Sequence, residues 1–235
     1  MGSPESNEPR MKITSSATST ATSARQPQPV TTPKSAPMGT IRSGEVRRMT
    51  RDEAWEILCE YTKSESLRKH GLAVEAAMRY FAARFEGDEE IWAVTGLLHD
   101  FDYERDPDGH PQNGKPILEQ AGVPGEIVHA IQSHGDHTGV PRVTPLEKTL
   151  YAVDELCGFV TAVALVKPSR AVRDVDAPSV RKKMKDKAFA RAVSREMMLR
   201  GAQDMDIPFD ELVGEVVRAL DRVADRLGLA GVATV

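Results

Sequence analysis

From Thr50 onward, hydrophobic residues recur at three- and four-residue steps, a spacing that places them on one side of an α-helix. The clearest stretch covers about residues 64–85, where the apolar stripe of Leu, Val, Ala, Met and Phe also contains His70. We find no convincing stretch in which apolar and polar residues alternate as they do in a half-buried strand. The pattern therefore predicts an all-helical protein.

Helix-capping signals indicate where several of these helices begin. Thr50 is followed three residues later by Glu53, which is a capping box, and Thr144 is followed by Pro145, an N-cap with Pro at the first helical position. Asp, Pro and Gly residues between 102 and 114 predict a loop. The predicted helices cover residues 50–61, 64–85, 88–99, 116–121, 125–133, 144–166, 179–186, 194–203 and 209–227. We expect residues 50–230 to form a single all-α bundle.

The first 43 residues have a different composition. Ser, Thr, Pro and Ala dominate this segment, and no acidic residue occurs between Met11 and Gly44. Such a segment does not carry enough apolar surface to fold by itself. The sequence predicts a disordered leader over residues 1–43.

Composition and charge narrow the class of protein. With 40% hydrophobic and 28% charged residues, the chain has the composition of a soluble globular protein. The net charge is −4, and because residues 1–43 carry five basic and two acidic side chains, the acidic excess lies in the helical part. This charge argues against nucleic acid as a bulk electrostatic partner. The longest apolar run, Phe159 to Val166, is about half of what a membrane span requires, so we expect no membrane insertion.

The two cysteines favour a reducing compartment. Cys59 and Cys157 are far apart in sequence, form no C-x-x-C motif, and both lie within helix-like apolar patterns. Buried reduced thiols are therefore favoured over a disulfide, and we expect the protein to be cytoplasmic.

Candidate metal ligands occur on three predicted helices. His70 lies on the apolar stripe of the second helix, and His99 with Asp100 ends the third. Asp154 shares one helix face with the apolar Leu150. A carboxylate buried without a partner would cost several kcal/mol or take up a proton, so a cation is expected beside it. For His70 alone, a hydrogen-bonded core histidine is the simpler interpretation.

The order His, then His-Asp, then Asp is that of the HD superfamily of metal-dependent phosphohydrolases, and this sequence resembles that family. His110 and His134 resemble the additional histidines of the HD proteins that bind two metals, as in bacterial HD-type diadenosine polyphosphate hydrolases. Residues 50–227 are also similar to a group of bacterial HD proteins through the motifs HDFDYE, TPLEKTLYAVDELCGF and KKMKDKAFA. The resemblance implies a single helical HD-domain bundle.

The resemblance also implies a dinuclear site. Two divalent cations about 3.5–4 Å apart would share a bridging hydroxide that attacks a phosphoester or phosphoanhydride of a small molecule, with a nucleotide as the expected substrate. Asp100 would reach both cations. The remaining ligands would be His70, His99 and Asp154 for one cation and His110 and His134 for the other. These donors accept Fe, Mn, Co, Ni or Zn and do not choose between them.

Other residues are candidates for substrate contacts. His137, just beyond His134, is either an acid on the substrate side or a loop residue. Lys63 and Ser64 begin a helix whose N-terminus would attract an anion. Lys167 and Arg170 follow the helix of Asp154 and form a second possible phosphate contact. For each basic or capping residue the alternative is a helix cap or a solvated charge.

Two other functions compete with hydrolysis. Some HD proteins use the same kind of site with mixed-valent diiron as an oxygenase, and the ligand residues alone do not separate the two reactions. A non-catalytic ligand-binding module is the third interpretation. Missing ligands would favour it, but all four residues of the minimal motif are present. The sequence does not determine the oligomeric state.

Overall fold

The structure is a computed structural model that describes residues 48–232. The leader predicted for residues 1–43 lies outside the described residues. The elements in chain order are α1 (Arg51–Tyr61), α2 (Glu65–Arg84), α3 (Glu89–Leu98), α4 (Lys115–Gln120), α5 (Gly125–Ser133), η1 (Asp136–Thr138), α6 (Pro145–Val166), η2 (Val172–Asp174), α7 (Ala177–Met184), α8 (Arg195–Asp204), α9 (Phe209–Asp221) and α10 (Ala224–Leu227).

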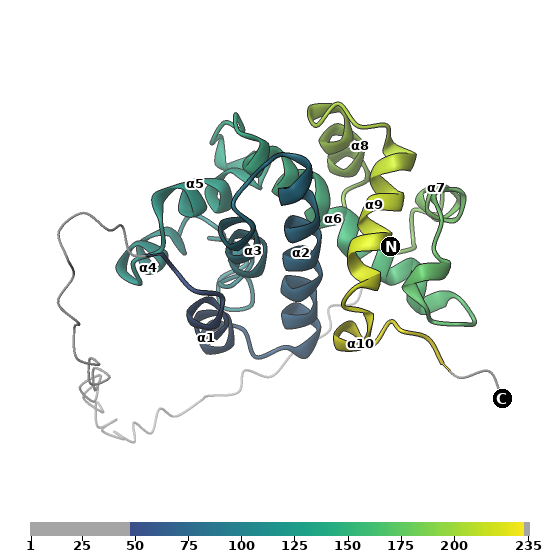
Figure 1. Ribbon diagram of the computed structural model, residues 1–235, viewed down its shortest axis with the longest axis horizontal. Coiled ribbons are helices and arrows are strands. Elements are labelled where there is room, and N and C mark those ends of the chain that lie inside the picture. Colours follow the sequence, from purple (N-terminus) through teal and green to yellow (C-terminus); the bar gives the residue numbers. More distant parts are fainter. Residues whose placement is uncertain (1–47, 233–235) are drawn as a thin grey trace, which may run out of the picture. The chain divides into compact units, whose positions relative to one another are not determined.

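The described part of the chain is all-α, as predicted. Between residues 48 and 232 there is no strand, and the one isolated β-bridge joins Ala171 to Ala230. Helix α2 has its most extensive contacts with α3 and α6, and Figure 1 shows it between α3 and α9. The apolar stripe of α2 is buried in this position, including Val74, Met78 and Phe81. Three helices that carry candidate ligands therefore pack against one another in the core.

The local signals for helix starts are confirmed. Thr50 and Glu53 form the capping box of α1, and Thr144 caps α6 with Pro145 at the first turn. The predicted last helix, 209–227, is instead divided, because the backbone of Val223 leaves the helical region at φ −123° and ψ 16°. The described chain then continues as the short helix α10.

Helix α6 is the central apolar helix. Among the described helices, it alone is long and apolar enough to cross a membrane by length and composition, with a mean hydropathy of 1.6 over its best window. The length of the longest uninterrupted apolar run did not predict that α6 meets this criterion, because the criterion averages hydropathy over a longer window. Inside the structure 61% of that window is buried. A core helix of a soluble protein passes the same test, so α6 is weak evidence for a membrane span.

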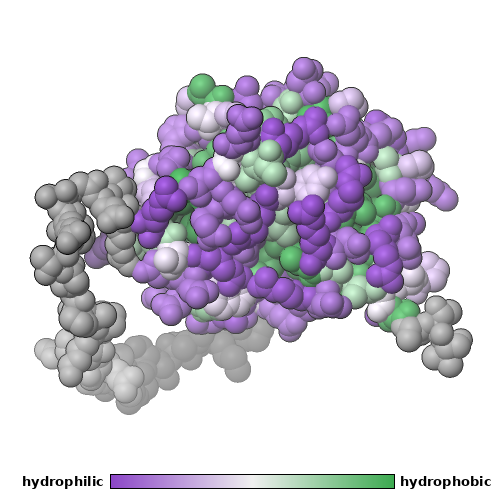
Figure 2. Space-filling model, viewed as in Figure 1, coloured by the Kyte–Doolittle hydropathy of each residue, from purple (hydrophilic) through white to green (hydrophobic). Residues whose placement is uncertain are grey.

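The surface and the cysteines agree with the sequence patterns. The face seen in Figure 2 is mostly hydrophilic, with hydrophobic side chains in small separate areas. Cys59 and Cys157 are both free, as predicted; Cys157 is buried as expected, whereas Cys59 is only half-buried. The polar faces of the amphipathic helices are therefore exposed, while their apolar faces form one core.

Candidate metal centre

Four candidate ligands meet where α2, α3 and α6 pack together. His70 lies in the first half of α2, His99 caps the C-terminus of α3, Asp100 follows it, and Asp154 lies on α6. Oδ1 of Asp154 is 3.0 Å from Nε2 of His70 and 3.3 Å from Nε2 of His99. Oδ2 of Asp100 is 3.4 Å from Nε2 of His99 and 3.8 Å from Nε2 of His70. One atom from each residue can thus contact a single ion.

A second group adjoins the first through Asp100. Its other oxygen, Oδ1, is 3.0 Å from Nε2 of His110 and 3.5 Å from Nε2 of His134. The two Nε2 atoms of these histidines are 3.2 Å apart. The carboxylate of Asp100 therefore has one oxygen in each group, which is the arrangement that a ligand shared by two cations requires.

The ring orientations are set on the side away from this centre. Nδ1–H of His99 donates to the carbonyl of Gly96 over 2.8 Å, and Nδ1–H of His134 donates to the carbonyl of Ile131 over 2.6 Å. A carbonyl only accepts, so Nδ1 carries the proton and Nε2 keeps its lone pair in the neutral ring. This is how metal-binding histidines are usually oriented.

The donor set fits a cation. Nε2 of His99 is buried without a hydrogen-bond partner, although two carboxylates lie within ion-pair distance. In the neutral rings of His110 and His134, the two Nε2 lone pairs face each other across 3.2 Å. Such neighbours repel unless a proton or a metal ion lies between them. Mixed imidazole and carboxylate donors favour divalent transition metals.

The pKa values of the ligand side chains indicate that protons take the place of a cation in the metal-free protein. Burial opposes charge on His99, but the negative charges of Asp100 and Asp154 outweigh it and raise the pKa of His99 well above its usual value. Burial also opposes charge on His110, yet its hydrogen bonds with Asp100 and Asp102 raise its pKa to about 9. Conversely, despite burial, the charge of His99 holds the pKa of Asp100 well below its usual value. Protons therefore occupy the centre until a metal replaces them.

A cavity of about 510 Å³ opens onto both ligand groups. His137 lines it and donates from Nε2 to the carbonyl of His110 over 2.9 Å, so the structure brings this predicted acid to the site. The apolar part of the lining includes Leu67, Val193 and Met197. The cavity thus combines a polar floor with apolar sides, as small-molecule sites do.

The predicted phosphate contacts are not brought to this cavity. The backbone N–H groups of Lys63 and Ser64 both donate to Oε2 of Glu104, over 2.7 and 2.8 Å. The N-terminus of α2 is therefore already occupied by a carboxylate of the chain itself. Lys167 caps the C-terminus of α6, and Arg170 follows it; neither lines the cavity. None of these four residues lines the cavity, and a contact of any of them with a phosphate stays a prediction.

Two residues near the centre were not predicted. Asp102 is buried, and its Oδ1 accepts from Nδ1–H of His110 over 2.6 Å. The position of Asp102 two residues after Asp100, in the motif HDFD, could have indicated that it lies near the centre. Glu155 lines the cavity, and burial followed by the negative charge of Asp154 raises its pKa to about 7. The sequence did not predict Glu155, because the helical period places it next to the apolar face of α6 and not on that face.

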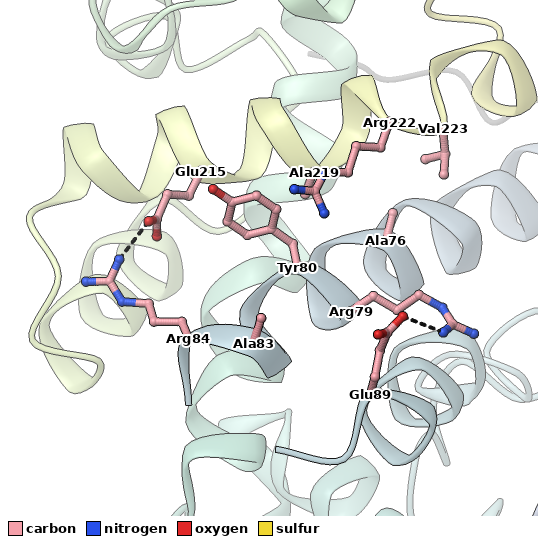
Figure 3. Close-up of a pocket in the computed structure, with 10 residues that line it drawn as sticks. All are labelled: Ala76, Arg79, Tyr80, Ala83, Arg84, Glu89, Glu215, Ala219, Arg222 and Val223. Carbon is pink, nitrogen blue, oxygen red and sulfur yellow. Dashed lines mark hydrogen bonds and ion pairs between the residues drawn. The ribbon is translucent and has the colours of Figure 1, made fainter. Parts of the chain in front are cut away.

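Another cavity, of about 580 Å³, lies between α2 and α9 (Figure 3). Nη1 of Arg79 lies 3.0 Å from Oε1 of Glu89, and Nη1 of Arg84 lies 2.6 Å from Oε1 of Glu215. These four charged side chains therefore form two ion pairs. No histidine lines it among the residues described. This cavity holds an ion-pair network between helices, and the metal-type donors converge elsewhere.

Comparison with known proteins agrees with this geometry. Residues 67–158 match the family model described as HD domain, and this range contains all six candidate ligands. No curated protein and no solved structure matches the chain. Residues 67–158 are therefore an HD domain, the domain that defines a superfamily of metal-dependent hydrolases.

Proposed function

We propose that the protein is a metal-dependent phosphohydrolase that cleaves a phosphoester or phosphoanhydride of a small molecule, with nucleotides among the first substrates to test. The observation that supports it is the shared carboxylate: Asp100 places one oxygen in each of two ligand groups. Divalent cations bound there would neutralise phosphoryl oxygens and lower the pKa of an attacking water. We take Fe, Mn, Co, Ni and Zn as candidates.

The chain's own residues would orient the substrate. Asp100 and Asp154 hold negative charge at the floor of the cavity, so a phosphate group approaches only when cations are present. His137 stands at the wall, exposed to the cavity, where its ring can hold a proton for the leaving oxygen. Leu67 and Met197 limit the access of bulk water from the opposite side.

We also propose that the reaction takes place in the cytoplasm and that the partner is a small phosphorylated substrate. Both cysteines are free, which suits a reducing compartment. The net charge of −4, with its acidic excess in the helical part of the chain, disfavours nucleic acid as a bulk electrostatic partner.

The test is a phosphate-release screen over nucleotides and small phosphomonoesters, with Mn, Co, Fe, Mg or Zn added to the purified protein. Asp100→Ala should lower kcat by at least about 10²-fold, because both ligand groups lose a donor. Asp108→Ala is the matched control, since this aspartate is exposed in the same loop. Undiminished release by Asp100→Ala would refute the proposed role of the centre.

The same experiment addresses the oxygenase alternative. Iron-loaded protein should release phosphate without consuming O₂. A diiron spectrum together with O₂ consumption and carbon-bond cleavage would replace hydrolysis by oxygenation.

A further inference from the structure

A second cavity, of about 360 Å³, adjoins the candidate metal centre. His70 and Gly158 line both this cavity and the one that opens onto the ligands. The two cavities therefore lie next to each other, with these two residues common to their linings. We call the adjoining one the α2–α6 pocket; its further walls are Thr161 and Leu165 from α6, and Leu227 and Leu229 from the end of α10 and the residues after it.

The α2–α6 pocket continues along one face of α6. Asp154, Gly158, Thr161 and Leu165 follow one another at steps of four, three and four residues, which keeps them on one side of the helix. From Asp154 to Leu165 this face is about 16 Å long at 1.5 Å per residue. A molecule with its phosphate at the metal centre would thus extend along α6 into the pocket.

Gly158 has no side chain at the place where the linings of the two cavities overlap. A Cβ atom at this position would meet only Cγ2 of Val193, at 3.9 Å, which is an ordinary contact. A larger side chain at position 158 would project into the space where the cavities meet. We therefore expect a large side chain at position 158 to separate the two cavities.

The pocket is mostly apolar. Of its lining residues, Leu227 and Leu229 are buried and Leu165 is 49% exposed. Covering such a side chain by an apolar ligand is favourable.

Cationic side chains are scarce around both cavities. Between residues 48 and 232, no Lys or Arg lines the cavity at the ligands, and Lys69 alone lines the α2–α6 pocket. Nζ of Lys69 is 2.7 Å from Oε1 of Glu65, so its charge is already partly neutralised. The additional charges of a di- or triphosphate would meet little positive charge from the protein.

We infer that the α2–α6 pocket binds the organic part of the substrate, and that the substrate is a phosphate monoester whose organic group is uncharged and apolar. This rests on the proposed function for the phosphate end. It excludes nucleoside triphosphates as the preferred class, because no Lys or Arg lines the cavity at the ligands and the one lysine of the pocket, Lys69, is paired with Glu65.

Binding tests the pocket without catalysis. Titration calorimetry would compare hexylphosphonate with methylphosphonate, both non-hydrolysable, on the full-length protein loaded with Mn²⁺. Hexylphosphonate should bind more tightly by about tenfold for every two methylene groups that enter the pocket. Equal affinities for the two phosphonates would overturn the inference.

Gly158→Leu should remove this preference by filling the connection, and hexylphosphonate should then bind no better than methylphosphonate. Val166→Asn is the matched control, because Val166 is exposed at the end of the same helix and does not line the pocket. Thermal unfolding and Mn²⁺ content would establish that Gly158→Leu folds and retains its metal. A folded, loaded Gly158→Leu protein with an intact preference would contradict the assignment.

Hydrolysis separates this inference from the proposed function. Phosphate release should have a higher kcat/KM for hexyl phosphate than for methyl phosphate or adenosine triphosphate. If all three are hydrolysed and adenosine triphosphate is preferred, the proposed function stands and the substrate class is wrong. Another outcome is that hexylphosphonate binds more tightly than methylphosphonate, and Gly158→Leu removes this preference, while no phosphate ester is cleaved. That result would support the pocket as a binding site and refute the proposed function.

Discussion

Nδ1 of His110 lies 2.6 Å from Oδ1 of Asp102, on the side of the imidazole opposite the metal-type donors. Both side chains are buried. The carboxylate thus fixes the tautomer of His110 and makes Nε2 a better electron donor.

We therefore expect Asp102→Asn to weaken Mn²⁺ binding by about 10- to 100-fold, because the ring loses its anionic partner. Titration calorimetry of the chelator-treated protein measures this directly. Asp108→Asn, in the same loop but exposed, should bind Mn²⁺ as the unmodified protein does. If the two variants had equal affinities, Asp102 would have no part in metal binding.

Metal stoichiometry tests the shared carboxylate. The two ligand groups predict two cations per chain in the unmodified protein. His70→Ala and His110→Ala each damage one group and should each retain one cation, whereas Asp100→Ala should retain almost none. Elemental analysis after equilibrium dialysis gives these numbers. An Asp100→Ala protein with full occupancy would show that the carboxylate is not a shared ligand.

The stability of the metal-free protein should fall in alkaline solution. The pKa of His110 is raised from 6.5 to about 9 by its carboxylate partners, so its stabilising charge is fully present below pH 6.5 and is lost as the pH rises through about 9. The free energy of unfolding should decrease over this window by on the order of 2–3 kcal/mol. Chemical unfolding of chelator-treated protein between pH 6 and pH 10 measures the change.

The affinity for Mn²⁺ should have the opposite pH dependence to the stability of the metal-free protein. Cations displace the protons of the centre, so Mn²⁺ affinity should increase with pH over the same window. An affinity independent of pH would mean that the histidines are not the groups that lose protons on binding.

Gly96 sets the distance between α2 and α3. A Cβ atom at this position would lie 2.8 Å from the carbonyl oxygen of Val74 and 2.9 Å from the backbone N of Glu75, closer than real side chains approach. Gly96→Ala should therefore push the helices apart, destabilise the protein by about 1–3 kcal/mol and displace His99, which follows on the same helix. Thermal unfolding and Mn²⁺ titration report the two effects.

Gly125→Ala is the matched control, since no atom lies within 4 Å of the added Cβ. It should leave both the stability and the Mn²⁺ affinity within measurement error. Equal behaviour of the two alanine variants would refute the importance of the close contact between α2 and α3.

The two thiols should differ in reactivity. Burial, and then the negative charge of Asp154, raise the pKa of Cys157 well above its usual value, and its Sγ lies in the core 3.8 Å from the carbonyl of Ala73. A thiol reagent should therefore modify Cys59 first and Cys157 only on unfolding. The Cys59→Ser protein should show no fast phase; a fast phase in that variant would show that the α6 core opens under native conditions.

The sequence predicted the helices and the donors because both depend on local patterns. Capping residues such as Thr50 and Thr144 act within one turn, and the position of His70 on an apolar stripe follows from the helical period. The family resemblance then indicated which of these side chains belong to one site.

The substrate contacts were harder to predict because they depend on tertiary neighbours. Whether Lys63 and Ser64 receive a phosphate is decided by Glu104, about 40 residues later, whose carboxylate takes both N–H groups. The α2–α6 pocket depends similarly on Leu227 and Leu229 closing a space beside Gly158. Neither relationship leaves a periodic signal in the sequence.

The contact of Glu104 with the start of α2 affects how the protein acquires its metal. With the bond from Thr62 to the carbonyl of Phe101, it ties the beginning of the loop that carries Asp102 and His110 to the helical scaffold. Half of the centre is thus held in place by contacts that involve no cation. We therefore expect the chain to fold without a cation, so that metal uptake would follow folding.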